Sequence, residues 1–255
     1  MTQATYPDLQ DASVFVTGGG SGIGAAITDG FLAQGAHVAF VQRSDAGAFC
    51  DAMDAKHGRR PLFIPCDITD VAALQGALDQ AAETHGPITV LVNNAANDQR
   101  HTTEEVTEEF WDRSQAINLK AYFFACQAIT AGMVKAGGGA IVNFTSVSYM
   151  MGNAGFPSYT SANAGITGLT RSLAREFGPS GIRVNALAPG WVLTDKQKDM
   201  WATPDALTAH LERQCLKEHL VEDDIVGTVL FMASSASRMM TGQVVVVDGG
   251  VVTTG

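Results

Sequence analysis

The sequence contains few cysteines and few charged residues, and it has no apolar segment long enough to span a bilayer. Its 255 residues include four cysteines, Cys50, Cys66, Cys126 and Cys215, which lie far apart and form no CxxC pair. This spacing argues against a disulfide framework and against a zinc site. The first ten residues, MTQATYPDLQ, have neither a basic region nor an apolar stretch, so we predict no secretory signal. We therefore expect a cytoplasmic protein with reduced, isolated thiols.

Basic residues are also scarce. The chain has 16 lysines and arginines against 26 aspartates and glutamates, which gives a formal net charge of −10. Nucleic acids and anionic membrane surfaces would repel such a chain, so neither is expected as a partner. Hydrophobic residues make up 46% of the sequence, an ordinary balance for a globular protein with a sizeable core.

Short, nearly continuous apolar segments alternate with longer segments of helical spacing. Strands are predicted at residues 13–17, 37–41, 61–64, 89–93, 140–145, 183–188 and 244–248. Strands that are apolar on both faces and joined by helical crossovers predict a parallel sheet with helices on both sides. No linker, repeat or low-complexity segment divides the chain. We therefore predict one doubly wound α/β domain, with a seven-stranded parallel sheet, over residues 1–255.

Residues 103–136 are predicted to form one extended helix preceded by an acidic turn. The acidic residues are Glu104, Glu105, Glu108 and Glu109. Neighbouring carboxylates can hold a metal ion, but they also suit a solvated first helical turn, where they face the positive end of the helix dipole. We favour the helical turn and predict no metal site.

A polar, mostly helical segment at residues 191–221 lies between the sixth predicted strand and a late helix. Insertions after the carboxyl end of a strand are where such sheets carry lids and substrate loops. We predict a substrate loop or lid at about residues 190–221.

The segment TGGGSGIG at residues 17–24 follows the first predicted strand. Glycines permit a tight turn and a close approach of the backbone to a pyrophosphate, which binds at the N-terminus of the next helix. The pattern alone is also compatible with an ordinary strand-to-helix turn. Here it opens an amphipathic segment that a second strand follows, as the dinucleotide-binding motif requires. We therefore predict a dinucleotide cofactor.

The second predicted strand ends in Gln42, Arg43 and Ser44. An acidic residue at this place would bind the ribose 2′-hydroxyl of NAD, whereas an arginine suits the 2′-phosphate of NADP. Gln42 occupies the expected acidic position and Arg43 follows it. NADP is therefore preferred and NAD is the alternative, unless Arg43 is only a solvated loop residue.

With these motifs in place, the chain resembles the short-chain dehydrogenase/reductase family along essentially its whole length. TGGGSGIG looks like the family's cofactor loop, and CDI at residues 66–68 looks like its adenine site. NNAA at residues 93–96 is similar to the family's NNAG, and PGWVLT at residues 189–194 resembles its nicotinamide-carboxamide loop. The resemblance implies a Rossmann fold and these cofactor-binding residues: Gly18, Ser21, Gly22, Ile23, Gly24, Gln42, Arg43, Asp67, Ile68, Asn94, Ala95, Tyr159, Asn163, Pro189, Gly190, Val192 and Thr194.

The resemblance also implies a catalytic group. Ser146 lies thirteen residues before Tyr159, which is the family's spacing, and Asn118 matches an asparagine that holds a water in a proton relay. A tyrosine phenolate can remove the proton from an alcohol, and a serine hydroxyl can hold the substrate oxygen. Taken alone, Ser146 could instead be a strand-end hydroxyl bonded to the backbone, and Tyr159 a packed helix phenol.

One position departs from the family motif Tyr-x-x-x-Lys. In YTSANAG the lysine position is Asn163, one helical turn from Tyr159. An asparagine can bind a ribose hydroxyl but carries no charge to stabilise a phenolate. An unperturbed tyrosine has a pKa of ~10, so neutrality requires roughly three pKa units, or about 4 kcal/mol. We expect a loss of on the order of 100-fold or more in rate near pH 7.

Three explanations for Asn163 stay open: a weakened or alkaline-active dehydrogenase, a cofactor-binding protein that has lost catalysis, or a deliberately substituted chain. Lys120, two residues after Asn118, offers a replacement cation. Its ordinary interpretation is a solvated helix lysine, because residues two apart do not share a helix face.

NDQRH at residues 97–101, with GWVLTDKQ, MWATP and QCLKEHLVEDDIV, resembles the family branch that oxidises aldoses at C1 to the lactone. D-xylose, L-arabinose, D-galactose and L-fucose are substrates of that branch. A sugar pocket needs polar groups around a ring and an aromatic wall. The predicted substrate-binding residues are Asn97, Asp98, Arg100, His101, Ser146, Ser148, Tyr159, Trp191, Lys196 and Trp201. As alternatives, Asp98 and Arg100 form a loop ion pair and His101 caps the following helix.

The sequence therefore predicts an NADP-preferring sugar dehydrogenase. The competing hypotheses are a non-catalytic nucleotide-binding protein of the same fold and a dehydrogenase for another small polar secondary alcohol. Many members of the family are homotetramers, and the apolar segment VVVVDGGVV is consistent with burial at a subunit contact. The resemblance thus implies a homotetramer.

Overall fold

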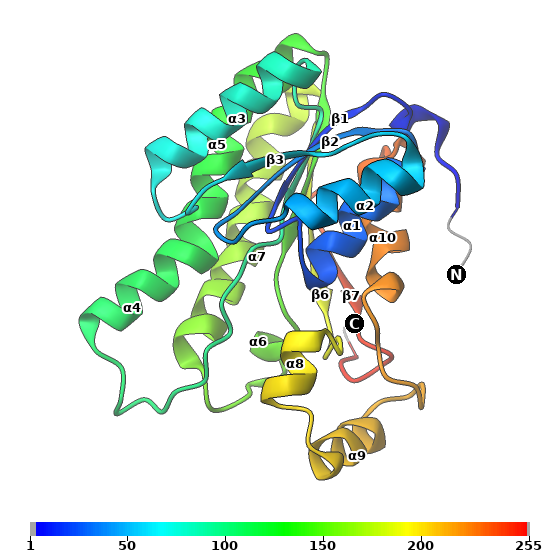
Figure 1. Ribbon diagram of the computed structural model, residues 1–255. Helices are drawn as coiled ribbons and strands as arrows, with labels where there is room; N and C mark the ends of the chain where they lie inside the picture. The colour runs from blue at the N-terminus through cyan, green and yellow to red at the C-terminus, as the bar shows by residue number, and fades with distance from the viewer. Residues whose placement is uncertain (1–3, 254–255) are drawn as a thin grey trace.

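Seven parallel strands form the central sheet of the computed structural model, which describes residues 4–253 (Figure 1). The strands are β1 (Ser13–Thr17), β2 (His37–Gln42), β3 (Leu62–Pro65), β4 (Val90–Asn93), β5 (Gly139–Phe144), β6 (Ile182–Pro189) and β7 (Val244–Val247). Their order in the sheet is β3-β2-β1-β4-β5-β6-β7, and all neighbours are parallel. The predicted fold class is confirmed, and every predicted strand boundary lies within one residue of the observed one. Residues 1–3 and 254–255 of the predicted domain lie outside the described residues.

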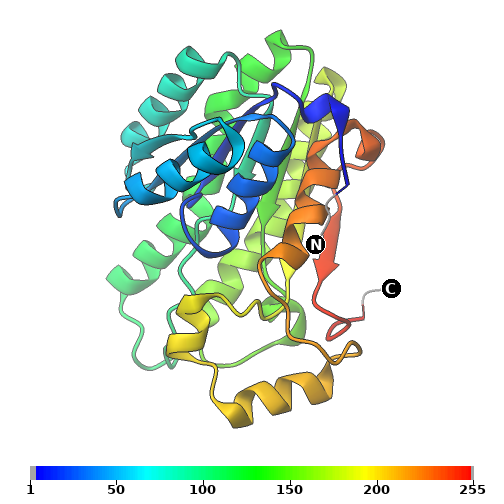
Figure 2. The same ribbon diagram turned by 45° about the vertical axis from the view of Figure 1, so that its right-hand side comes forward.

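Helices cover both faces of this sheet (Figures 1 and 2). One face carries α1 (Gly22–Ala33), α2 (Gly47–His57) and α10 (Asp223–Ala233). The other carries α3 (Val71–His85), α5 (Ala121–Lys135) and α7 (Pro157–Phe177). Short 3-10 helices lie at Pro7–Leu9, Gly178–Ser180 and Ser235–Ser237.

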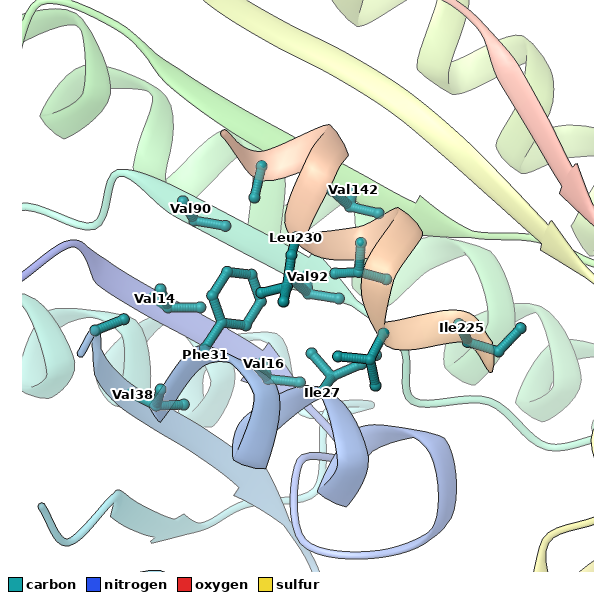
Figure 3. Packing of buried hydrophobic residues seen from close by; sticks show 14 of the residues in the cluster. Val14, Val16, Ile27, Phe31, Val38, Val90, Val92, Val142, Ile225 and Leu230 are labelled. Carbon is teal, nitrogen blue, oxygen red and sulfur yellow. The ribbon is translucent and has the colours of Figure 1, made fainter. Parts of the chain in front are cut away.

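The core has two halves because successive strand residues point to opposite faces of the sheet. On β1, Val14 and Val16 pack with Phe31 of α1 and Leu230 of α10, whereas Phe15 belongs to the cluster on the other face. Figure 3 shows the first cluster between the sheet and these two helices. Burial of each such side chain contributes about 1.5–3 kcal/mol to the stability of the fold. Helix packing on both faces therefore stabilises strands that have no polar face.

The strand order reverses between β1 and β4, because the chain proceeds from β1 to β2 and β3 on one side and to β4 and β5 on the other. Ligands of doubly wound sheets bind in the crevice at such a switch point, beyond the carboxyl ends of the strands. The glycine-rich turn follows β1 and the segment 94–107 follows β4, so both predicted binding segments meet there.

The predicted helix over residues 103–136 differs from the structure in its start and its regularity. It begins as α4 (Glu108–Gln115), because the Thr107 hydroxyl caps it by accepting a hydrogen bond from the N–H of Phe110 at 3.1 Å. Glu108 and Glu109 therefore form the acidic first turn. A π-helical turn, Ala116–Lys120, then joins α4 to α5. It carries Asn118, and π-turns are frequent at functional sites.

The segment between β6 and α10 contains α8 (Asp195–Met200) and α9 (Pro204–Arg213). In Figures 1 and 2 both helices lie beyond the carboxyl end of β6, and α9 is the farther one from the sheet. Val192 and Leu220, both buried, form a single parallel bridge at the base of this segment. A short helix, α6 (Ser148–Met151), faces it after β5.

The four cysteines are free thiols, as predicted; Cys215 is exposed and the other three are buried. Within residues 4–253, no helix has the length and the apolar character that a bilayer crossing requires.

Candidate active site

A cleft of about 1400 Å³ runs along the carboxyl ends of the strands, from the turn after β1 to helices α8 and α9. All predicted cofactor-binding residues line it, from Gly18 to Thr194. All predicted substrate-binding residues line it except His101. It is also lined by the predicted catalytic residues Ser146, Tyr159, Asn118 and Asn163. The fold therefore gathers almost the whole predicted site around one cavity.

The glycine-rich turn has the shape of an anion cradle. Gly18 and Gly22 have φ of +70° and +50°, in the left-handed region where other residues are strained. A Cβ at Gly24 would lie 1.8 Å from the carbonyl oxygen of Gly18, so α1 starts directly against the turn. Ser21 precedes α1 without capping it by its side chain, which leaves the N–H groups of the first helical turn available. These amides and the helix dipole fit a pyrophosphate.

The end of β2 carries the neutral amide of Gln42 and the guanidinium of Arg43, at the place expected to face the ribose of a dinucleotide. The Gln42 side chain accepts a hydrogen bond from the N–H of Gly20 at 3.0 Å and donates to the carbonyl oxygen of Ser44 at 3.1 Å. Arg43 is exposed, and its Nη1 lies 4.0 Å from Oδ2 of Asp67, which follows β3. With Gln42 at this place, no carboxylate at the end of β2 would repel a 2′-phosphate.

Two asparagines hold the segment after β4 in place. The Asn94 side chain donates to the carbonyl oxygens of Thr17 at 3.0 Å and Gly18 at 3.2 Å, which ties β4 to the glycine turn. Asn118 accepts from the N–H of Asn97 at 2.8 Å and donates to its carbonyl oxygen at 3.1 Å. The Asn118 amide is therefore engaged by the loop backbone, and Asn118 is 1% exposed.

Tyr159 and Ser146 meet in the cleft from α7 and from the segment after β5. Burial raises the pKa of the Tyr159 hydroxyl, and the carboxylate of Asp98 acts in the same direction. Hydrogen bonds from Ser146 and Asn163 and the positive charge of Arg100 oppose this rise without cancelling it. Tyr159 is therefore a neutral phenol at pH 7.

Asn163 is turned back onto its own helix. Its Nδ2 donates to the backbone carbonyl oxygen of Tyr159 at 2.8 Å, and the backbone carbonyl oxygen of Asn163 accepts from the Thr145 hydroxyl at 2.8 Å. The same side-chain amide forms a hydrogen bond with the Tyr159 hydroxyl that favours its ionisation. The residue is 2% exposed, and it brings no charge to the tyrosine. Lys120, the alternative cation, lies exposed on the helix surface.

Asp98 connects the loop after β4 to α8. It accepts from Lys196 Nζ at 2.8 Å and from Gln197 Nε2 at 2.7 Å. Gln197 in turn accepts from the indole N–H of Trp191 at 2.9 Å. Burial opposes ionisation of Asp98, but the hydrogen bond and charge of Lys196 outweigh it and hold the pKa of Asp98 below its usual range. Three predicted sugar ligands, Asp98, Lys196 and Trp191, thus bond within one network.

Arg100 packs between two aromatic rings that line the cleft. Its Cζ lies 4.1 Å from the centre of the Phe156 ring and 5.3 Å from that of Trp201. Asp98 pairs with Lys196, so the alternative ion pair between Asp98 and Arg100 does not form. Because the aromatic rings contact the faces of the Arg100 guanidinium, the N–H groups at its edge can still donate hydrogen bonds to other partners.

His101 does not belong to the cleft, contrary to the prediction. Its Nε2 lies 2.7 Å from the Ser158 hydroxyl and its Nδ1 lies 3.1 Å from the Thr102 carbonyl oxygen. The ring is buried and meets Phe110 edge-on at 4.8 Å. Both ring nitrogens are used within the protein, so His101 joins α7 to the loop that precedes α4.

Gln197 and His210 line the cleft but were not predicted. Their polar segment was recognised, but its sequence does not reveal which helix face meets the cleft. Burial lowers the pKa of His210, and the charge of Arg213 adds to this, so the imidazole is neutral at pH 7. In the described part of the chain, three buried atoms that belong to cleft-lining side chains lack a hydrogen-bond partner: Ser148 Oγ, Trp201 Nε1 and His210 Nε2.

Comparison with known proteins agrees with this geometry. A family model described as enoyl-(acyl carrier protein) reductase matches residues 18–252. The chain is 47% identical over 253 residues to a protein of Rhizobium meliloti (strain 1021) named probable galactose dehydrogenase, over 98% of this chain and 99% of the relative. It is 40% identical to D-xylose 1-dehydrogenase of Caulobacter vibrioides (strain NA1000 / CB15N), over 98% of this chain and 99% of that protein.

A solved structure is also similar. The crystal structure of a blue fluorescent protein from a metagenomic library, in complex with NADPH, has a TM-score of 0.88 and 36% sequence identity. The match covers 96% of this chain and 99% of that one. The chain belongs to the short-chain dehydrogenase/reductase family and is an NAD(P)-dependent oxidoreductase.

Proposed function

We propose that the protein oxidises the C1 hydroxyl of an aldose to the lactone. The observation that carries this proposal is the set of unpartnered polar atoms, Ser148 Oγ, Trp201 Nε1 and His210 Nε2, on side chains that line the same cleft as Ser146 and Tyr159. A buried polar atom without a partner costs about 1–3 kcal/mol, which a substrate with several hydroxyl groups can relieve. Two relatives named for galactose and D-xylose support the same class of substrate.

The amides of the first turn of α1 would hold the pyrophosphate of the cofactor, and Asp67 would lie beside its adenine. Arg43, exposed next to Gln42, would bind a 2′-phosphate, so NADP is the preferred cofactor and NAD the alternative. When bound, the oxidised nicotinamide accepts a hydride from C1 of the sugar.

Tyr159 would take the proton of the C1 hydroxyl, while Ser146 would hold the sugar oxygen by a hydrogen bond. Loss of one hydride from C1 and one proton from O1 converts the ring hemiacetal into a lactone. A hemiacetal hydroxyl is more acidic than that of a simple alcohol, because the ring oxygen withdraws electrons. A tyrosine without a neighbouring lysine is therefore better matched to C1 of an aldose than to an isolated secondary alcohol.

Asn163 favours a second candidate function, a nucleotide-binding protein without catalysis. Its amide would bind a ribose hydroxyl but would leave Tyr159 with a raised pKa. The two candidates differ in one observable, sugar-dependent reduction of the cofactor at alkaline pH. An enzyme with a weak base gains rate as the pH rises, whereas a binding protein shows none at any pH.

The test is reduction of NADP and NAD between pH 6.5 and 10.5 over a panel of aldoses. Asn163→Lys is measured in parallel, and Tyr159→Phe serves as the control without a base. Rate on one aldose that rises with pH and vanishes in Tyr159→Phe supports the proposal. If neither the given chain nor Asn163→Lys oxidises any sugar, while both bind the cofactor, the binding function is the better account.

We further propose that the chain acts as one domain with residues 190–221 as its lid, and that it assembles as a homotetramer. Trp111 of α4 and Phe123 of α5 are exposed, at 39% and 40%, and the residues of β7 at the sheet edge are only partly buried. Exposed apolar groups on these elements are the kind that a subunit contact would cover. Sedimentation equilibrium tests the assembly.

A further inference from the structure

A phenolate at Tyr159 needs a positive charge that Asn163 does not carry. The charged and titratable groups around Tyr159 come from three elements. The loop after β4 contributes Asp98 and Arg100, α5 contributes Tyr122, and α8 contributes Lys196 through its bond to Asp98. Burial raises the pKa of Tyr122, so that neighbour stays neutral. Arg100 is thus the cation of this set that is not already paired with a carboxylate among the described residues.

The position of Arg100 relative to Tyr159 follows from a stack of rings. The guanidinium lies over the Phe156 ring at 4.1 Å, and the Phe156 ring lies 5.7 Å from that of Tyr159. The sum of these two distances is therefore an upper limit on the separation between the Arg100 guanidinium and the centre of the Tyr159 ring. Trp201 covers the guanidinium as well, at 5.3 Å, so the charge is held in place by aromatic contacts and not by an acid.

The same loop carries the opposing charge. Asp98 lies two residues before Arg100 and acts against ionisation of Tyr159. Its charge is compensated by Lys196, whose Nζ lies 2.8 Å away. Gln197 supplies a further hydrogen bond at 2.7 Å. Helix α8 therefore offsets the negative charge of Asp98, which opposes ionisation of Tyr159. No acid offsets the positive charge of Arg100 in this set of residues.

We propose that Arg100 supplies the positive charge beside Tyr159 that an asparagine at position 163 cannot supply. This inference rests on the proposed function of Tyr159 as the base. Arg100 acts through Tyr159 and is a positioning residue. At separations on the order of 10 Å and an effective dielectric constant of about 20, one charge shifts a pKa by roughly one unit, and less where solvent screens it. Arg100 thus replaces part of a lysine's effect from the substrate side of the cleft.

The test measures the ionisation of Tyr159 directly. Protein labelled with 13C at tyrosine Cζ is titrated by NMR, and the Tyr159 signal is assigned with Tyr159→Phe. Because a raised pKa lies near the limit of alkaline stability, the series is run in the given chain and again with Asn163→Lys, which brings the titration into a milder range. No sugar is needed, so the result does not depend on whether an aldose is the substrate.

Arg100→Gln is expected to raise the Tyr159 pKa by about half to one unit in both series. Arg100→Lys should restore the pKa, because it keeps the charge, and Asp98→Asn should lower it, because it removes the opposing charge at nearly the same volume. The limb of the kcat profile on which the rate rises with pH should move with the NMR value. An unchanged Tyr159 pKa in Arg100→Gln, in a variant that unfolds at the same temperature as its parent, would overturn the inference. A rise in KM alone would make Arg100 a substrate ligand instead.

Discussion

The side chain of Asn118 forms two hydrogen bonds with the backbone of Asn97. It accepts from the N–H at 2.8 Å and donates to the carbonyl oxygen at 3.1 Å. Asn118 stands in the π-helical turn between α4 and α5, and Asn97 begins the loop that carries Asp98 and Arg100. The asparagine therefore fixes the loop that faces Tyr159. A role of its side chain in a proton relay would have to coexist with these two bonds.

Asn118→Leu should destabilise the fold by about 1–3 kcal/mol, because it leaves a buried N–H and a buried carbonyl without partners. Asn118→Asp is the matched control. It still accepts from the N–H of Asn97 but places an oxygen against the carbonyl, so its loss should be intermediate at neutral pH. Urea unfolding measures both. Equal stability of Asn118→Leu and the parent would mean that the loop does not depend on this contact.

Asn163→Lys should raise the oxidation rate near pH 7 by on the order of 100-fold on the favoured sugar. The ammonium stabilises the phenolate and lowers the Tyr159 pKa, so a larger fraction of the base is ionised at neutral pH. The gain should shrink as the pH rises toward the raised Tyr159 pKa of the parent, where the parent phenol ionises as well. Asn163→Leu, which removes the amide without adding charge, should gain nothing. A pH profile of kcat compares the three.

Asp98 should contribute stability that is lost on acidification. Its pKa in the folded protein lies below its ordinary value of ~3.9, so its pairing with Lys196 is fully present above that value and disappears as the pH falls through the folded pKa. The unfolding temperature of the parent should therefore drop more steeply below about pH 4 than that of Asp98→Asn. Parallel slopes for the two proteins would show that the carboxylate is not preferentially ionised in the folded state.

His210→Phe should raise KM for the favoured sugar about tenfold, the value of one hydrogen bond, and leave the dissociation constant of the cofactor unchanged. His210→Gln retains a donor and an acceptor and should keep part of the affinity. Because the pKa of His210 is lowered by burial, KM of the parent should not vary between pH 7 and 8 through this residue. A KM that is insensitive to His210→Phe would remove it from the sugar pocket.

Gln42→Asp combined with Arg43→Ser should turn a preference for NADP into one for NAD. The added carboxylate would repel a 2′-phosphate and accept a bond from a free 2′-hydroxyl. We expect the affinity for NADP to fall by about 10- to 100-fold, corresponding to loss of a charge-assisted hydrogen bond. Dissociation constants from cofactor fluorescence measure the change. Arg43→Lys, which keeps the charge, separates the electrostatic effect from the loss of the planar guanidinium.

The strands were predictable because each is an apolar segment buried on both faces, and TGGGSGIG was predictable because its glycines are needed where a Cβ would collide. The partners of the polar residues were not. The sequence allowed Asp98 to pair with Arg100, but Lys196, nearly a hundred positions later, occupies that carboxylate. His101 looked like a ligand because of its place in the loop, whereas Ser158 of α7 holds its ring. Contacts between distant segments depend on how helices are rotated, and periodicity does not determine that rotation.

The bridge between Val192 and Leu220 gives the segment between them a closed base. Both residues are buried, and the N–H of Leu193 donates to the carbonyl oxygen of Leu220 at 2.9 Å, so the 27 residues between Val192 and Leu220 leave and rejoin the rest of the domain at one place. Beyond this base, the segment contacts the loop after β4 through Lys196 and Asp98, and the chain after β7 through Leu216 and Gly249. We therefore expect that exchanging this proposed lid, together with these contacts, for the corresponding segment of a relative would change the choice of sugar as a unit.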